Sequence, residues 1–109
     1  MTNTSRGNPM GKLESLTTKN LREKLQLAAA HQITHEELVQ WCSSRLVYLY
    51  NKHLDKDTAK AYSIAEGIDA QWNLYLSNAF SFTERQSLNT KEIEMPSGWL
   101  EAWINKLEV

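Results

Sequence analysis

The sequence predicts an all-α fold, a single-domain bundle of four or five helices that follows a disordered N-terminal tail. Apolar residues recur three or four positions apart over most of the 109-residue chain, which is the spacing of one face of an α-helix. Polar residues typical of helix N-termini stand before several of these segments. We expect residues 1–11 to form the tail and residues 12–109 to form the helical domain. The sequence leaves open whether Met1 or Met10 is the native start.

The tail and the first helix differ in composition. Residues 1–11 are polar, contain two glycines and one proline, and lack the apolar stretch of a secretory signal. Farther along, Leu21, Leu25 and Ala28 lie four and three residues apart and form one apolar stripe. This spacing predicts a helix over residues 18–30.

The second helix has the clearest start in the sequence. Thr34 stands three residues before Glu37, so the two residues can form a capping box, in which each side chain accepts a hydrogen bond from the other's backbone N–H. The pattern predicts one helix from Thr34 to about Leu54, uninterrupted by proline or glycine. Its apolar stripe consists of Leu38, Cys42, Leu46, Leu49 and His53. Four further residues widen this stripe and predict contacts with more than one neighbouring element: Val39, Val47, Tyr48 and Tyr50.

The third helix is expected to follow Asp55 or Asp57, because an aspartate can accept hydrogen bonds from the free N–H groups at a helix start. Its stripe consists of Ala61, Ala65, Ile68, Trp72, Tyr75 and Ala79. Gly67 lies within this segment and is less favourable than alanine in a helix by about 1 kcal/mol. We expect Gly67 to mark either close packing between helices or a bend.

Two shorter helices complete the predicted bundle. Ser81 and Glu84 have the spacing of another capping box, which predicts a short helix over residues 82–88. Pro96 cannot continue the preceding segment and Ser97 is a good N-cap, so a last helix is expected after them. The stripe of this last helix consists of Leu100, Trp103, Ile104 and Leu107.

Charge and composition exclude several classes of protein. The net charge is −1, but residues 1–54 hold seven lysines or arginines against four acids, and residues 55–109 hold five against nine. Such asymmetry can guide the encounter with a charged partner. No apolar run approaches the roughly 20 residues of a membrane span, so we expect no membrane insertion. Cys42 is the only cysteine, which excludes an internal disulfide and favours a cytoplasmic location.

No residue pattern points to catalysis, a cofactor or a metal. His31 and His35 are four residues apart, but Thr34 begins a new helix between them, and no third ligand completes a metal site. Cys42 falls on an apolar stripe, where a thiol packs as a small hydrophobe. His53 is expected to be a partly buried residue of the bundle. We therefore predict a protein that is not an enzyme and that binds no cofactor or metal.

Aromatic residues give the best indication of function. The chain has four tryptophans and four tyrosines, residue types that are favoured at binding hot spots. Trp99 stands at the start of the last helix, where full burial in a small bundle is difficult. We predict a surface for another protein, one with a basic face, made of two tryptophans and the acids near them: Trp99, Trp103, Glu92, Glu94 and Glu101. A homodimer is also left open.

A DNA-binding regulator is the alternative function. The first helix, a short turn and the second helix together resemble a helix-turn-helix. The second helix, however, would present Glu36 and Glu37 to the phosphates, and the chain has no basic stripe. We therefore rank nucleic-acid binding below protein binding.

The stretch from Ile33 to Leu38, which leads into a long helix with Arg45, resembles the early helical region of colicin D-type immunity proteins. The resemblance covers about 25 residues. It implies a small helical inhibitor that covers the basic active site of a toxic RNase with its own acidic residues. No functional residue is carried over from that family. The resemblance extends the prediction of protein binding to an inhibitor or immunity protein for a basic toxin or nuclease.

Overall fold

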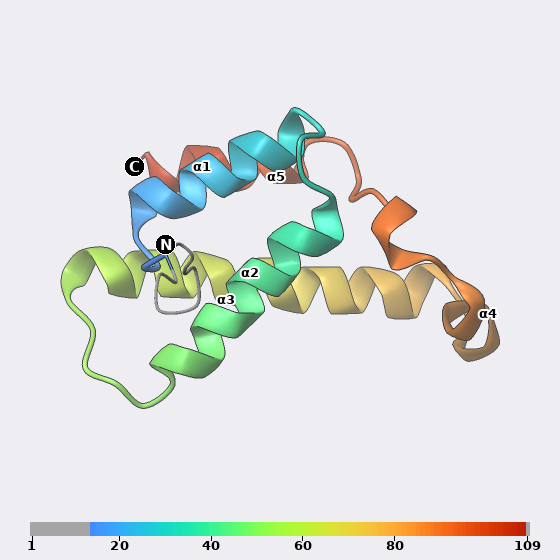
Figure 1. Cartoon of the computed structure of the whole chain (residues 1–109), viewed down its shortest axis with the longest axis horizontal. Coiled ribbons are helices and arrows are strands. Elements are labelled where there is room, and N and C mark those ends of the chain that lie inside the picture. The colour runs from blue at the N-terminus through green and yellow to red at the C-terminus, as the bar shows by residue number, and fades with distance from the viewer. Residues whose placement is uncertain (1–13, 109) are drawn as a thin grey trace, which may run out of the picture.

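The computed structural model describes residues 14–108, and within them the protein is all-α (Figure 1). Its α-helices are α1 (Thr18–Ala29), α2 (His35–Leu49), α3 (Lys56–Ala79), α4 (Phe82–Ser87) and α5 (Trp99–Leu107), and a 3-10 helix, η3 (Thr90–Glu92), precedes α5. The predicted fold class is confirmed. The predicted disordered tail and the choice between two start methionines lie outside the described residues.

The longest helix is α3; α1, α2 and α5 pack against it, and α1 also packs against α2 and α5 (Figure 1). The most extensive contacts join α2 to α3 and α1 to α5. One core lies between these helices, and its fully buried members include Leu21, Leu25, Leu38 and Ile68. None of the described helices combines the length and the apolarity needed to cross a membrane.

Side-chain caps begin most of the helices as the sequence predicts. Thr34 Oγ1 accepts from the Glu37 N–H at 3.0 Å, and Glu37 Oε1 accepts from the Thr34 N–H at 2.8 Å, which completes the capping box of α2. Ser81 and Glu84 form the same pair of bonds at the start of α4. Of the two candidate aspartates before α3, Asp55 is the cap. The sequence predicted these helix starts because each cap joins two residues that are only three positions apart.

The start of α5 differs from the prediction. Ser97 was expected to cap it, but the N-cap is Gly98, and no side chain makes a capping hydrogen bond. The Trp99 N–H bonds to the Pro96 carbonyl at 3.3 Å, so a turn leads into the helix. Gly98 has a φ of 93°, a left-handed conformation that glycine adopts without steric cost. A backbone turn therefore replaces the predicted serine cap.

The second helix is shorter than predicted, ending at Leu49 instead of Leu54. Asn51 has a φ of 64°, which is incompatible with a right-handed helix, and the Lys52 N–H bonds to the Leu49 carbonyl in a turn. His53 consequently lies in the following loop and is exposed, so the expectation of a partly buried bundle residue was wrong. Leu46, expected in the core, is only partly buried.

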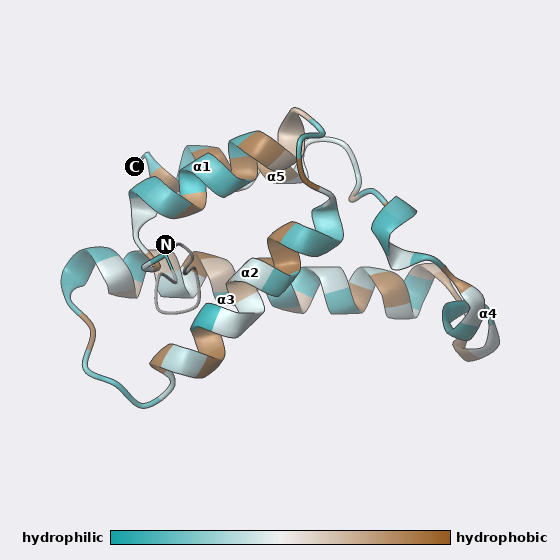
Figure 2. Ribbon diagram, in the orientation of Figure 1, coloured by the Kyte–Doolittle hydropathy of each residue, from teal (hydrophilic) through white to brown (hydrophobic). Residues whose placement is uncertain are grey.

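The broad apolar arc of α2 is exposed near its C-terminal end. α2 contacts α1, α3 and η3, and Val39 is buried, so the predicted contacts with more than one neighbouring element are made. Val47, Tyr48 and Tyr50, however, are 76%, 64% and 68% exposed. Figure 2 shows apolar colour continuing along α2 to this end of the helix. Periodicity identified an apolar surface here, but no described helix covers it.

Gly67 is not required by close packing. A Cβ built on it would meet no heavy atom within 4 Å, and α3 passes through this position as one uninterrupted helix. The expectation of a close approach between helices was therefore wrong. Gly67 leaves a small open space beside α3.

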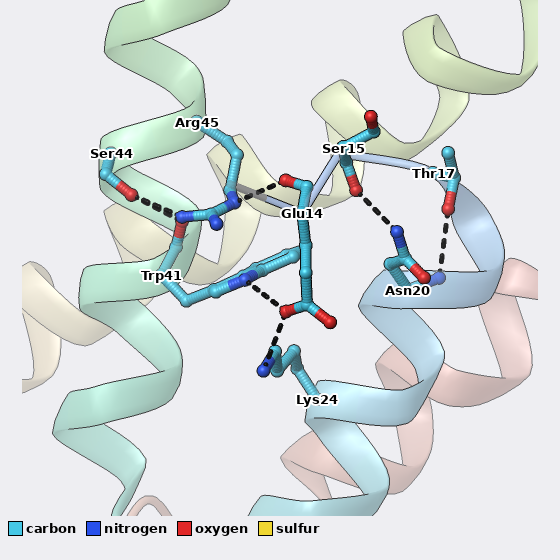
Figure 3. A network of polar contacts seen from close by, with 8 residues as sticks. All are labelled: Glu14, Ser15, Thr17, Asn20, Lys24, Trp41, Ser44 and Arg45. Carbon is cyan, nitrogen blue, oxygen red and sulfur yellow. Dashed lines mark hydrogen bonds and ion pairs between the residues drawn. The ribbon is translucent and has the colours of Figure 1, made fainter. Parts of the chain in front are cut away.

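Polar contacts attach the segment before α1 to α2 (Figure 3). The Glu14 carboxylate pairs with Lys24 Nζ at 2.9 Å and accepts a hydrogen bond from Trp41 Nε1 at 3.2 Å. The Arg45 guanidinium donates to the Glu14 carbonyl at 3.0 Å and lies 4.4 Å from the centre of the Trp41 ring. The hydrogen bond from Lys24 lowers the pKa of Glu14. Trp41 is thus a structural residue between two cations.

The C-terminal part of α3 and the whole of α4 carry few buried side chains. We call residues 73–88 the arm (Figure 1). Leu76 is its only buried residue. Most apolar residues of the arm are therefore not covered by the protein's own core.

Candidate functional site

Trp99 lies where α5 begins and is held by two aromatic neighbours. Its ring packs edge to face on Tyr75 of α3, with the centroids 5.8 Å apart, and on Trp103 at 5.9 Å. Edge-to-face aromatic pairs at this distance are favourable, so they fix the ring in place. Trp99 remains partly exposed. It is therefore a rigid aromatic side chain at the surface, as a binding residue needs to be.

A shallow groove of about 440 Å³ lies beside this ring. We call it the Trp99 groove, and its lining residues are Gln71, Leu74, Tyr75, Asn78 and Trp99. Leu74 is 61% exposed and contributes apolar surface to the groove. None of the lining residues is charged. The groove can bury apolar groups of a ligand, and the Gln71 and Asn78 amides can bond to polar ones.

The predicted site residue Trp103 lies in the core. Its side chain is 4% exposed, as is that of Leu107, while Leu100 and Ile104 are only partly buried. The most buried side of α5 therefore includes Trp103, and the Trp103 ring packs against the Trp99 ring. In this structure it offers no exposed surface to a partner.

The three predicted acids are exposed, but none lines the Trp99 groove. Glu94 Oε2 lies 3.4 Å from His31 Nδ1, at the corner between α1 and α2. Glu101 follows Trp99 by two residues, which places it about 200° around α5. Glu92 belongs to η3. The structure therefore separates the acids from Trp99. Glu101 points to another side of α5, and Glu92 and Glu94 precede the turn into α5 and lie in other parts of the fold.

The groove residues that sequence reasoning missed come from α3. Tyr75 was assigned to a core stripe, and Gln71, Leu74 and Asn78 were not singled out. Leu74 lies two residues from Trp72, on the far side of the helix from the buried stripe. A large apolar residue at such a position is the signal that could have identified this face. The contact between this face of α3 and α5 depends on the tertiary fold, and no pattern of residues close in sequence predicts it.

The first turn of α2 is covered by the chain that follows α4. His35 is 7% exposed, and its Nδ1 accepts a hydrogen bond from the Met95 N–H at 2.8 Å. Burial lowers the pKa of His35. The Thr90 hydroxyl donates to the Glu36 carboxylate. The turn that a helix-turn-helix protein would present to DNA is thus occupied by η3 and the residues after it.

A second apolar groove lies on the opposite half of α2. We call it the α2 groove; it measures about 350 Å³ and is lined by Leu46, Val47, Tyr50 and Tyr62. Lys52 Nζ lies 5.1 Å from the centre of the nearby Tyr48 ring. This surface resembles the Trp99 groove in apolarity but has no tryptophan, and it provides a matched control surface.

Cys42 is the one thiol in the chain, and it lies in the core. Burial raises its pKa to about 12, so the thiol stays protonated at neutral pH and is a poor nucleophile. Over residues 14–108, no three histidine, cysteine or acidic side chains come close enough together to hold a metal ion. The described residues therefore give Cys42 no role as a nucleophile and hold no three-ligand metal cluster.

Comparison with family models, curated proteins and solved structures finds no match to this chain.

Proposed function

We propose that the protein is a non-catalytic module that binds another protein through the Trp99 groove. The observation that carries the proposal is a tryptophan fixed by two aromatic rings beside an exposed leucine, in a groove without charge. Buried aromatic anchors with apolar neighbours dominate the energy of many protein interfaces. The groove is also too open and too uncharged to favour a small polar substrate.

An inhibitor or immunity protein for a basic toxin or nuclease is the specific form of this proposal. The acidic excess of residues 55–109 supports a basic partner. Because the exposed acids lie outside the Trp99 groove, they act on the encounter: charges at the edge of an interface change the association rate more than the final affinity. The single cysteine favours a reducing, cytoplasmic setting.

DNA binding receives no support from the arrangement of α2. Its buried His35 and the covering segment that includes Met95 occupy the turn that would enter a groove of DNA. The exposed residues in the first turns of α2 include Glu37 and Gln40, and neither carries a positive charge. Protein binding therefore remains the better supported function.

The test begins with capture of partners from native lysate by the immobilised full chain. Each captured protein is then tested against Leu74→Asp, which places a charge in the Trp99 groove. We expect this variant to lose the partner, because an unpaired carboxylate in an apolar contact is strongly unfavourable.

Val47→Asp is the matched control, since Val47 is at least as exposed as Leu74 but lies in the α2 groove. The control should retain the partner, and circular dichroism should show both variants folded. Retention of the partner by Leu74→Asp, or its loss only from Val47→Asp, would overturn the assignment of the Trp99 groove.

A further inference from the structure

Residues 89–95 lie over the first turn of α2, and we call them the cover segment. They include η3, whose main contacts are with α2. Met95 is the only buried residue of the cover segment, with 6% of its surface exposed. In contrast, α5 packs mainly on α1 and buries Trp103 and Leu107. The cover segment can therefore leave α2 while the core between α1, α2, α3 and α5 stays packed.

Two hydrogen bonds attach the cover segment to α2. The Thr90 hydroxyl donates to the Glu36 carboxylate, and the Met95 N–H donates to His35 Nδ1 at 2.8 Å. The second bond is buried and joins residues 60 positions apart. Because Nδ1 accepts a hydrogen bond, it carries no proton, and the proton of the neutral ring is on Nε2. A further proton must therefore bind at Nδ1, the atom that holds Met95.

Protonation of Nδ1 turns this acceptor into a donor that faces the N–H donor of Met95. The hydrogen bond is lost, and the Met95 N–H is left buried without a partner, which is more unfavourable than the loss of the bond alone. Opening of the cover segment relieves both effects, because water then bonds to the amide and to the ring. His35 lies in the wall of a pocket of about 190 Å³, so water and protons can reach the ring from that side.

The charged groups that face His35 from other parts of the fold do not replace this bond. The His31 ring stacks on the His35 ring with the centroids 6.4 Å apart, and Lys91 and Glu94 line the same pocket. Burial and His31 lower the pKa of His35, and Glu94 opposes them with a smaller effect. Glu94 also lies 3.4 Å from His31, but the two side chains are 63% and 66% exposed. Exposed ion pairs contribute little to stability, so this pair holds the cover segment only weakly.

The two acids that follow His35 on α2 already have partners. Glu36 accepts from the Thr90 hydroxyl, and Glu37 Oε1 accepts from the Thr34 N–H at 2.8 Å. The Glu37 bond lies within the capping box and does not involve the cover segment. Once His35 is protonated, the partly buried Thr90 bond is the one remaining hydrogen bond from the cover segment to α2 among the described residues.

We propose that the hydrogen bond between Met95 and His35 is a pH-sensitive latch, which releases the cover segment from α2 when His35 is protonated. The open form keeps the helical core and exposes Met95 and the first turn of α2. An exposed His35 titrates near its ordinary pKa of 6.5, so opening becomes more frequent as the pH falls from there toward the lowered pKa of the closed form.

The latch goes beyond the proposed function and does not depend on it. None of the residues that line the Trp99 groove belongs to the cover segment. Partner binding is measured with the captured protein, whereas the latch is measured on the chain alone. Either proposal can therefore fail without the other.

The test is amide hydrogen exchange of the ¹⁵N-labelled full chain, followed by NMR between about pH 5 and pH 7.5 and corrected for the intrinsic exchange rate at each pH. The Met95 amide should be less protected than the Leu25 amide of α1 at every pH. Its protection should fall several-fold toward the acid end, by at most about tenfold per pH unit because one proton is bound. Circular dichroism should show the same helix content throughout.

His35→Asn and His31→Asn are a matched pair of variants. Asparagine at position 35 places Oδ1, which accepts a hydrogen bond and does not titrate, near the position of Nδ1. Opening in this variant should no longer depend on pH. His31 has a φ of 61°, a conformation that asparagine adopts more readily than most residues, so His31→Asn keeps the turn. This control should retain the response to pH.

A second measurement on the wild-type protein does not depend on whether the variants fold. The ¹⁵N shifts of the His35 ring report protonation, and the amide shift of Met95 reports the latch. Both should change with the same midpoint, while the Leu25 amide shift stays constant. Titration of His35 without a change at Met95, or equal protection of Met95 and Leu25, would overturn the proposal. A wild-type response in His35→Asn, or its loss in His31→Asn, would do the same.

Discussion

The first part of α3 and the arm belong to neighbouring segments of the chain but differ in burial. Over residues 56–72, α3 buries an apolar stripe that α1, α2 and α5 cover: Ala61, Ala65, Ile68 and Trp72. In the arm, residues 73–88, only Leu76 is buried, while Leu74 and Phe82 are 61% and 75% exposed. Apolar spacing therefore identifies a face that can be buried. Whether the chain itself buries that face depends on which helices fold back over it.

The largest effect is expected from removing a buried side chain of the core. Leu25 is 0% exposed, so Leu25→Ala should lower the free energy of unfolding by about 2–5 kcal/mol through lost packing and a cavity. Leu74→Ala, in the arm, should change it by less than about 0.5 kcal/mol. Urea denaturation followed by circular dichroism measures both. Equal losses in the two variants would mean that the arm is as tightly packed as the core.

A smaller loss is expected at the turn before α5. Because Gly98 has a φ of 93°, any residue with a Cβ is strained there, and Gly98→Ala should cost about 1–2 kcal/mol. No heavy atom lies within 4 Å of the added methyl group, so strain is the only cause. Thermal denaturation checks the value. A variant as stable as the wild type would show that the turn relaxes at no cost.

His35 gives stability a dependence on pH. Burial is the main cause of its lowered pKa, and His31 adds to it, while Glu94 and the Ala28 carbonyl oppose it. The folded protein therefore binds a proton less readily than the unfolded chain, whose histidine has a pKa near 6.5. Stability is fully present above pH 6.5 and should fall as the pH drops from there toward the lowered pKa. Protonation of Nδ1 would also remove the acceptor for the Met95 N–H.

Denaturation midpoints between about pH 5 and pH 7.5 test this expectation. The wild type should lose stability toward the acid end, and His35→Gln, which keeps an acceptor without titrating, should show a flatter profile. Glu14 and Asp57 have lowered pKa values and ordinary values of 4.5 and 3.8, so they titrate below this window. Parallel profiles for the two proteins would exclude His35 as the source.

The smallest effect is a gain. Gly67 has open space around it and ordinary helical geometry, so Gly67→Ala should raise the free energy of unfolding by up to about 1 kcal/mol. The gain comes from the lower flexibility of alanine in the unfolded chain. Chemical denaturation measures it. A loss of stability would reveal a close contact that the structure does not contain.

Local signals predicted the fold well because they depend on residues close in sequence. The capping box of Thr34 and Glu37 fixed the start of α2, and the spacing of Leu21, Leu25 and Ala28 fixed the buried side of α1. The end of α2 was missed because a left-handed Asn51 has no spacing signal. The spacing of the α2 stripe also predicts Leu46 in the core, whereas its partial burial implies a smaller loss of stability on truncation than a buried leucine gives.

The candidate site was predictable only in part. Trp99 was identified by its place at the start of a helix, and it lines a groove. Trp103 and Glu101 were included because they are near Trp99 in sequence, but burial removes the first and helix rotation turns the second away. Tyr75 meets Trp99 only because α3 and α5 pack together. A contact between residues 24 positions apart requires the tertiary structure.

Reversing the charge of the exposed acids tests whether they affect the rate of association or the stability of the bound complex. If the acids act only on the encounter, Glu94→Lys combined with Glu101→Lys should slow association with a captured basic partner and reduce its dependence on salt, while dissociation stays nearly unchanged. Surface plasmon resonance at several salt concentrations measures both rates. A mainly faster dissociation would place these acids inside the interface.

The most direct test of the Trp99 groove is the affinity of Trp99→Ala for a partner captured by the wild-type chain, measured by isothermal titration calorimetry at low and high salt. The account predicts a dissociation constant raised by about fivefold or more at both salt concentrations, because the lost contact is apolar and uncharged. Circular dichroism must show the variant folded at the temperature of the titration. An unchanged affinity in the folded variant would contradict the central claim that the Trp99 groove binds the partner.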